Sequence, residues 1–219
     1  MPPYPRADER RTMVERQIAA RGIRDPRILA AMQEIPRHMF IPPPYDRAAY
    51  DDNPLPIGSG QTISQPYIVA LMTELLHPKA TDNMLEIGAG SGYQAAVLSR
   101  LVRQLTTLER IKTVADLARR NLEFLGIDNV VVIEGDGTLG YPENAPYDGI
   151  IVTAATPEVP RPLIEQLTDG GTLVVPVGGH DVQDLLTIRK QGKSINREFH
   201  GGVRFVPLIG QYGWENQYP

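Results

Sequence analysis

Three glycines follow a short hydrophobic stretch in the middle of the chain, in the order Glu86-Ile-Gly88-Ala-Gly90-Ser91-Gly92. The residues Met84–Ile87 before them have the pattern of a strand, and those from Tyr93 onward have the spacing of a helix. Glycines at such a turn let the backbone approach a ligand closely, and the helix N-terminus adds N–H donors. The pattern predicts a nucleotide site at the end of this strand.

The glycine spacing indicates which kind of nucleotide this is. A dinucleotide fingerprint has its third glycine one place after Gly92, where this chain has Tyr93. A nicotinamide oxidoreductase is therefore disfavoured. Glu86 stands two residues before the first glycine, which is the pattern of S-adenosylmethionine enzymes. A glycine-rich turn with a purely structural role is the alternative interpretation.

Two further acids lie where two more strands are expected to end. Glu109 closes Leu-Thr-Thr-Leu-Glu, where a carboxylate can accept hydrogen bonds from both hydroxyls of a ribose. Asp136, in Glu134-Gly-Asp136-Gly137, is placed to accept from the amino group of an adenine. A carboxylate at one strand end is common, but three together favour a cofactor site.

The sequence shows no constellation for metal binding or nucleophilic catalysis. It contains no cysteine, so a thiol nucleophile and any Cys-ligated zinc or iron–sulfur site are excluded. The four histidines are scattered without the spacing of metal ligands, and we expect no metal. His38, beside Met39 and Phe40, is expected to have a structural role.

The elements that would position these residues alternate between strand and helix from Asn83 onward, which predicts an α/β fold with a mostly parallel sheet. Strands are expected at 84–87, 105–108, 129–133, 147–152 and 171–177, and helices at 93–102, 113–125 and 161–167. In the tail, 184–190 and 198–206 form an expected hairpin at the sheet edge, joined by a polar turn over 191–197.

Helices are expected in the N-terminal part of the chain. One ends at Gly22, the next begins at Asp25-Pro26 and closes before Pro36, and a third covers Tyr67–Leu76. The proline- and glycine-rich stretch between Ile41 and Pro66 is expected to be a loop, and loops of this length are usually functional. We expect one domain over residues 1–219, with a helical and loop region (1–78), a cofactor-binding core (79–180) and C-terminal strands and tail (181–219).

Four segments of the chain together resemble the protein-L-isoaspartate O-methyltransferase family. They are Arg37-His-Met-Phe40-Ile-Pro42, Pro54-Leu-Pro-Ile-Gly58-Ser-Gly60-Gln61-Thr-Ile-Ser64-Gln-Pro66, the glycine motif, and Leu167-Thr-Asp-Gly-Gly171-Thr-Leu-Val-Val-Pro176-Val-Gly178. The resemblance runs from about Val14 to Trp214. It implies a Rossmann-like, doubly wound sheet of the S-adenosylmethionine methyltransferase type, with an N-terminal helical extension and a C-terminal β-hairpin.

The resemblance also implies the activity and its residues. A methyl group would pass from S-adenosyl-L-methionine, leaving S-adenosyl-L-homocysteine, to the free α-carboxylate of L-isoaspartyl residues in damaged proteins. Ser64 would be the catalytic residue. The cofactor would be bound by a larger set, namely Gln61, Thr62, Ile63, Ser64, Glu86, Gly88, Gly90, Ser91, Glu109, Asp136 and Gly137. By chemistry alone, Thr62 or Ser64 could equally be a cap for the helix that follows.

The net charge and the composition of the chain bear on other functions. A methyltransferase acting on RNA or a small molecule is the main alternative. RNA recognition needs a basic surface, and a chain with a net charge of −4 shows no sign of one. A protein that only binds the cofactor or a partner is a further possibility. No segment has the ~20 apolar residues of a membrane span, and residues 1–11 lack the apolar core of a secretory signal. We expect a cytoplasmic, monomeric enzyme whose substrates are isoaspartyl proteins and peptides, with no nucleic-acid or membrane partner.

Overall fold

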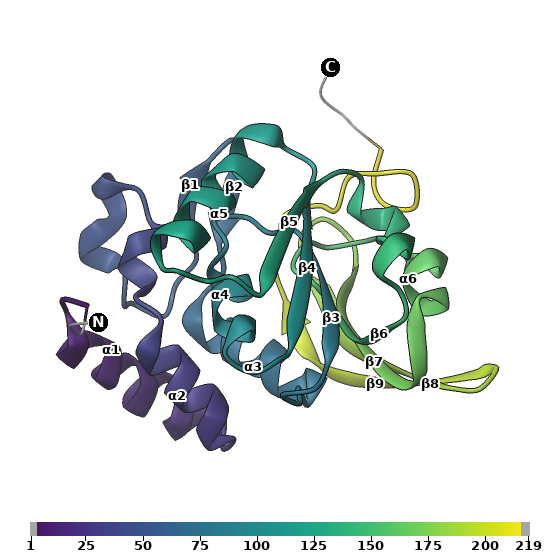
Figure 1. Cartoon of the computed structure of the whole chain (residues 1–219), viewed down its shortest axis with the longest axis horizontal. Coiled ribbons are helices and arrows are strands. Elements are labelled where there is room, and N and C mark those ends of the chain that lie inside the picture. Colours follow the sequence, from purple (N-terminus) through teal and green to yellow (C-terminus); the bar gives the residue numbers. More distant parts are fainter. Residues whose placement is uncertain (1–3, 216–219) are drawn as a thin grey trace.

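The core of the computed structural model, which describes residues 4–215, is a seven-stranded sheet in the order β5-β4-β3-β6-β7-β8-β9 (Figure 1). Strands β3 to β7 pair in parallel, and β8 and β9 are added antiparallel at one edge. The strands are β3 (Asn83–Ile87), β4 (Gln104–Glu109), β5 (Val130–Glu134), β6 (Tyr147–Val152), β7 (Leu167–Gly178), β8 (Gln183–Gln191) and β9 (Ser194–Val203). The expected mostly parallel α/β sheet is confirmed.

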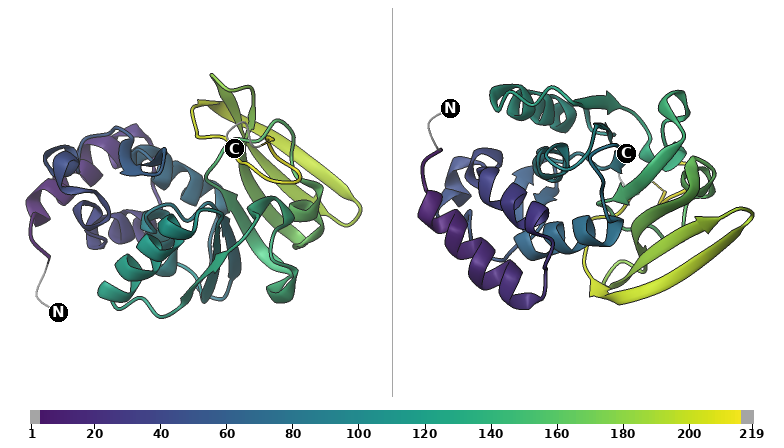
Figure 2. Two further views of the ribbon diagram at one scale, coloured as in Figure 1. Left: turned by 90° about the horizontal axis from the view of Figure 1, so that it is seen from above. Right: turned by 60° about the horizontal axis from the view of Figure 1, so that its bottom comes forward.

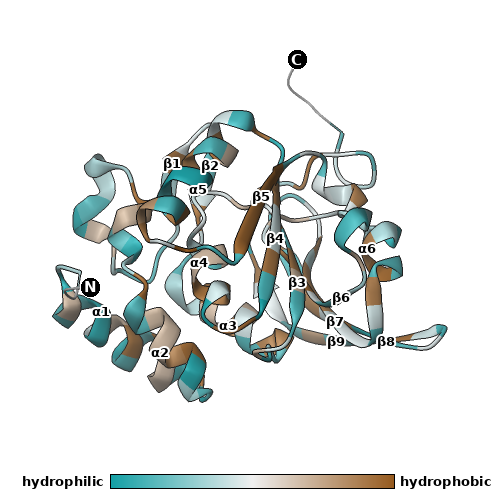
Figure 3. Ribbon diagram, in the orientation of Figure 1, coloured by the Kyte–Doolittle hydropathy of each residue, from teal (hydrophilic) through white to brown (hydrophobic). Residues whose placement is uncertain are grey.

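Successive residues of the central strands pack into two different cores. Met84 belongs to the larger core under the N-terminal helices, whereas its neighbour Leu85 belongs to the second core on the other side of the sheet. Ile151 and Ile150 divide in the same way. This is the two-residue period of a strand buried on both faces, and hydrophobic residues accordingly run along the strands in Figure 3.

Helices cover both faces of the sheet. On the face with the larger core, the sheet is covered by α3 (Pro66–Leu76), α4 (Tyr93–Ser99) and α5 (Lys112–Phe124). On the other face, α6 (Arg161–Glu165) packs beside β7. The predicted helix at 93–102 thus ends three residues early. That at 161–167 ends at Glu165, because β7 begins already at Leu167 through an irregular ladder with β6.

The N-terminal region adds a helical layer at one end of the molecule, opposite the tip of the β8–β9 hairpin (Figure 2). It contains α1 (Ala7–Met13), continued by a π-helical turn and a 3₁₀ turn to Arg21, and α2 (Pro26–Glu34). The expected stop at Gly22 is confirmed by its left-handed φ of 102°. The expected N-cap is confirmed too, because Asp25 accepts a hydrogen bond from the Arg27 backbone N–H at 2.9 Å.

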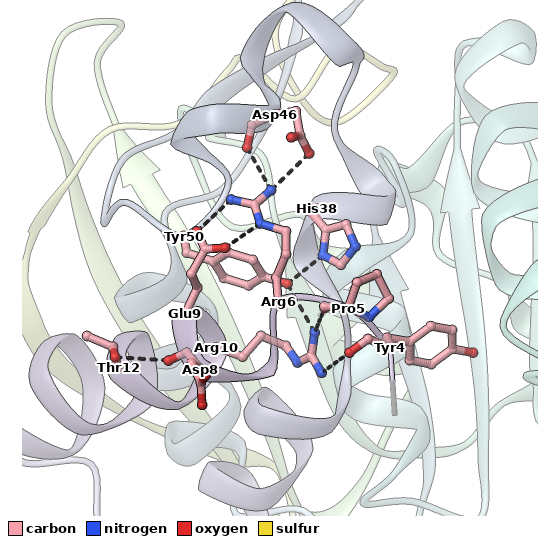
Figure 4. Close-up of polar contacts among 10 residues, drawn as sticks. All are labelled: Tyr4, Pro5, Arg6, Asp8, Glu9, Arg10, Thr12, His38, Asp46 and Tyr50. Atoms are coloured by element: carbon pink, nitrogen blue, oxygen red, sulfur yellow. Dashed lines mark hydrogen bonds and ion pairs between the residues drawn. The ribbon is translucent and has the colours of Figure 1, made fainter. Parts of the chain in front are cut away.

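Polar contacts fasten α1 to the segment that follows α2 (Figure 4). The Arg6 guanidinium donates to Glu9 at 2.7 Å and reaches Asp46, forty residues away, at 3.0 Å. His38 lies 2.6 Å from the Tyr50 hydroxyl through Nδ1, and burial lowers the pKa of its imidazole. These contacts give His38 a structural position in the N-terminal layer.

The stretch from Ile41 to Pro66 is not the irregular loop expected from its prolines. It contains 3₁₀ turns and a small antiparallel sheet of β1 (Leu55–Gly58) and β2 (Gln61–Ile63). Leu55, Ile57 and Ile63 are buried, whereas Pro56 between the first two is exposed. A proline is tolerated there because the strand lies at the edge of a two-stranded sheet and needs no hydrogen bond from that residue.

The C-terminal hairpin is confirmed, but its turn is shorter than expected. Strand β9 begins at Ser194, so the reversal is confined to Gly192-Lys193 rather than spread over 191–197. The outer positions of the expected single domain, Met1 and Pro219, lie outside the described residues. Within residues 4–215, no helix is long and apolar enough to cross a membrane.

Candidate functional site

A cavity of about 630 Å³ opens at the carboxyl ends of β3, β4 and β6. The chain runs from β3 outward to β4 and β5 and then returns to pair β6 on the other side of β3. Ligands of open α/β sheets bind at such a reversal of strand order. The glycine turn, the end of β4, the β1–β2 hairpin and the C-terminal segment all contribute to the lining.

The glycine turn is fitted closely to the end of β6. Gly88 has a φ of 95°, and a Cβ built there would meet the Thr153 Oγ1 at 2.5 Å. That same hydroxyl donates to the Gly88 carbonyl at 2.6 Å. Only glycine fits this position, and Gly88 to Ser91 line the cavity.

Two side chains offer hydrogen bonds at this turn. The Ser91 Oγ is buried without a partner among the described residues. The Glu109 carboxylate is held from both sides, because its oxygens accept from the backbone N–H groups of Gly90 at 3.1 Å and Ile111 at 3.0 Å. A carboxylate has about four acceptor positions, so Glu109 retains capacity for a ligand in the cavity.

Glu86 does not line the cavity. It is 0 % exposed and accepts a hydrogen bond from the Thr107 hydroxyl on the neighbouring strand. Burial raises the pKa of its carboxyl to about 8, against the lowering effect of the Thr107 hydrogen bond and with a smaller contribution from Glu109. The carboxyl is therefore bonded to β4 and lies outside the cavity lining, where the ligand contact was predicted.

The acid predicted to bind adenine also has other partners. Asp136 accepts from the Thr138 N–H at 2.9 Å and hydroxyl at 2.7 Å, and from the Gln211 N–H at 2.8 Å. It thus joins the end of β5 to the C-terminal segment. Gly137 lines the cavity, whereas Asp136 does not.

The predicted loop residues Gln61, Thr62, Ile63 and Ser64 all line the cavity. Arg37 holds this segment from behind. Its guanidinium is 0 % exposed and donates to the carbonyl oxygens of Ala49 at 2.5 Å, Asn53 at 3.1 Å and Ser64 at 3.0 Å. No carboxylate lies within ion-pair distance of it in residues 4–215, and burial lowers its pKa.

The Ser64 side chain does not cap α3. The helix begins after Gln65 without a capping hydrogen bond from a local side chain. Instead the Asp52 carboxylate accepts from the Tyr67 N–H at 2.9 Å and from the Gln65 amide at 2.8 Å. The half-buried Ser64 hydroxyl makes no hydrogen bond in the described part of the chain, so the capping alternative is removed.

Sequence reasoning missed the contribution of the C-terminal segment. Leu208, Ile209 and Trp214 line the cavity, and the Trp214 ring stacks on His180 with ring centroids 3.9 Å apart. Thr153 was missed as well. No local pattern marks these residues, because they reach the site only through the pairing of β6 and the path of the tail.

The charged residues of the site form no metal centre. Among the described residues, no group of three or more His, Asp or Glu side chains is arranged to hold a metal ion.

Comparisons with known proteins agree on one family. The family profile described as protein-L-isoaspartate(D-aspartate) O-methyltransferase matches residues 8–213. A protein-L-isoaspartate O-methyltransferase of Methanoregula boonei is 68 % identical over 214 residues, which are 98 % of this chain and 99 % of that relative.

Solved structures carry the same name. One protein-L-isoaspartate O-methyltransferase superposes with a TM-score of 0.82 at 32 % identity, covering 93 % of this chain and 67 % of its own. A Plasmodium falciparum protein assigned the same activity, crystallised with S-adenosyl-L-homocysteine, has a TM-score of 0.80 at 25 % identity and covers 91 % and 98 %.

Proposed function

The chain belongs to the protein-L-isoaspartate(D-aspartate) O-methyltransferase family, and we propose which of its residues bind the cofactor and which position the substrate for methyl transfer. The enzyme moves a methyl group from S-adenosyl-L-methionine to the free α-carboxylate of L-isoaspartyl residues in proteins. The resulting methyl ester is attacked by the following backbone nitrogen, which closes a succinimide and releases methanol. This begins the repair of the damaged linkage.

The observation that carries the proposal is the meeting of the glycine turn, Glu109 and the Ser64 hydroxyl around one cavity. The site fits the cofactor, since Gly88 to Ser91 line the cavity, Ser91 has a hydroxyl without a partner among the described residues and Glu109 has spare acceptor capacity. When bound, S-adenosylmethionine supplies a methyl group on a positively charged sulfur. Glu109 would accept from the ribose hydroxyls, with Gly88, Gly90, Ser91 and Gly137 around the nucleoside.

On the other wall, Gln61, Thr62, Ile63 and Ser64 would enclose the methionine part of the cofactor. In this proposal Glu86 supports the site through its hydrogen bond to Thr107 on β4, and Asp136 supports it through the C-terminal segment. A direct contact of Asp136 with adenine stays a prediction.

The substrate needs alignment more than activation. An isoaspartyl α-carboxylate is ionised at neutral pH, so no general base is required. The Ser64 hydroxyl would donate to this carboxylate and hold it in line for attack, which is a positioning effect. A normal aspartyl side chain, displaced by one methylene, would be rejected by misplacement rather than by charge.

The decisive experiment uses radiolabelled S-adenosylmethionine and two peptides that differ only in Asp or isoaspartate at one position. We expect base-labile label in the isoaspartyl peptide alone. Equal methylation of both peptides would contradict the proposed substrate. Labelling of RNA or of small molecules in preference to the peptide would favour the alternative methyltransferase.

A single domain over residues 1–219, divided at 78 and 180, is supported by a larger core that runs from Met13 through the sheet to Val203. We also propose a monomer in the cytoplasm, and light scattering and cell fractionation test these two points.

A further inference from the structure

A second cavity of about 510 Å³ lies beside the first one. The two share Thr62, Ser64, Thr153 and Val206 in their linings. Ser64 therefore lines both cavities, whereas the residues of the glycine turn line only the first.

The second cavity is a groove between two segments that are distant in the sequence. One wall is the stretch from Gly202 to Val206, which continues β9 at the open edge of the sheet. The other wall consists of Pro54, Thr62, Ser64, Gln65 and Ile68. Because an isoaspartyl carboxylate must reach Ser64 while its peptide chain continues in both directions, this groove is where the flanking chain has room.

Arg204 is the one charged side chain in the described lining of this groove. It is exposed, and no hydrogen bond or ion pair engages its guanidinium within residues 4–215. Asp52, which accepts a hydrogen bond from Gln65 in the other wall, is already paired with Arg21 at 2.6 Å. The groove thus offers an unpaired positive charge beside the reaction site, in a chain whose net charge is −4.

We propose that this groove holds the peptide flanking the isoaspartyl residue and that Arg204 favours substrates with an acidic side chain next to the damaged residue. The proposal rests on the proposed function of the site. An exposed charge pair acts mainly through Coulomb attraction in water, so the expected preference is about two- to fivefold and weakens at high salt.

The test compares kcat/KM for isoaspartyl peptides that carry Glu, Gln or Lys on either side of the isoaspartyl residue. The wild-type enzyme should rank them Glu, Gln, Lys, with about two- to fivefold between the first two on at least one side. Arg204→Ala should level this ranking, and Arg204→Glu should reverse it. Arg197→Ala is the matched control, because Arg197 is exposed on β9 outside both linings and should leave the ranking intact.

Three results would overturn the proposal while leaving the methyltransferase activity in place. One is a wild-type ranking independent of neighbouring charge. Another is an equal loss for all peptides in Arg204→Ala, which would assign Arg204 to the reacting carboxylate. The third is a weaker calorimetric affinity of Arg204→Ala for S-adenosylhomocysteine, which would assign the groove to the cofactor. Equal methylation of Asp and isoaspartyl peptides would instead contradict the proposed function itself.

Discussion

Ser64 presents a hydroxyl without a partner in the described structure at the junction of two cavities. If it positions the substrate carboxylate, Ser64→Ala should lower kcat about ten- to a thousandfold and leave residual activity. Affinity for S-adenosylhomocysteine should change little, because the glycine turn and Glu109 remain. Steady-state kinetics and calorimetry measure the two effects.

The control for Ser64 is Ser59→Ala, since Ser59 lines the same cavity from the β1–β2 turn. This variant should keep wild-type turnover. Wild-type turnover in Ser64→Ala would remove Ser64 from the catalytic role, and an acyl- or methyl-serine species in single-turnover mass spectrometry would contradict pure positioning.

The buried Glu86 carboxyl should make the stability of the fold depend on pH. Burial raises the pKa of its carboxyl to about 8, whereas in the unfolded chain the carboxyl has its ordinary pKa of 4.5. Between these values the folded state holds a proton that the unfolded state has lost. Glu86 therefore favours folding most below pH 4.5, and its contribution falls as the pH rises toward 8.

Glu86→Gln keeps a neutral side chain of the same shape at every pH. Relative to wild type, its free energy of unfolding should be higher at pH 8 than at pH 5 by at least about 1 kcal/mol, or about 2–4 °C in Tm. Thermal unfolding at the two pH values measures this difference. A constant difference between the two proteins would show that Glu86 does not titrate in this range.

Arg37 connects parts of the chain that are distant in sequence, because its side chain binds three backbone carbonyl oxygens at once. Its guanidinium joins the 3₁₀ turn that begins at Arg37 to the carbonyls of Ala49, Asn53 and Ser64. Lysine has no planar fork for three such acceptors. Arg37→Lys should leave buried carbonyls unpaired, lowering the free energy of unfolding by about 2–4 kcal/mol.

The matching control is Arg100→Lys, which alters only a surface ion pair with Glu34 at 3.0 Å and should cost less than about 1 kcal/mol. Chemical denaturation gives both values. Equal stability of the two variants would mean that Arg37 does not hold the segment around Ser64.

Strands and helices were predictable from the sequence where the spacing of hydrophobic residues matches the residues that are buried. Strands β3, β4 and β6 lie within one residue of their expected bounds, because each is a short apolar run next to a helical pattern. The β1–β2 hairpin was missed because Pro54, Pro56 and the nearby glycines conceal an alternation of only three buried residues. The glycine turn and Glu109 were found from local spacing, whereas Trp214, His180 and Thr153 depend on long-range packing that no window of sequence contains.

The whole molecule carries a net charge of −4, and this bears on what it can bind. Sequence-independent binding of nucleic acid depends on neutralising phosphates with basic residues. A fluorescein-labelled RNA at 0.15 M salt should therefore bind with a dissociation constant above about 10⁻⁴ M, as read by polarisation. Micromolar binding would revive an RNA substrate.

Trp214, which stacks on His180 in the lining of the first cavity, should report ligand binding through its fluorescence. Trp214 is the one tryptophan of the chain, so indole emission excited at long wavelength reports this position alone. Arrival of S-adenosylhomocysteine should change the intensity or wavelength of that emission and saturate with the calorimetric Kd. Trp214→Phe should bind without the signal, and unchanged emission of the saturated wild type would place Trp214 out of reach of the ligand. Occupancy could then be followed in real time, without a label, as light.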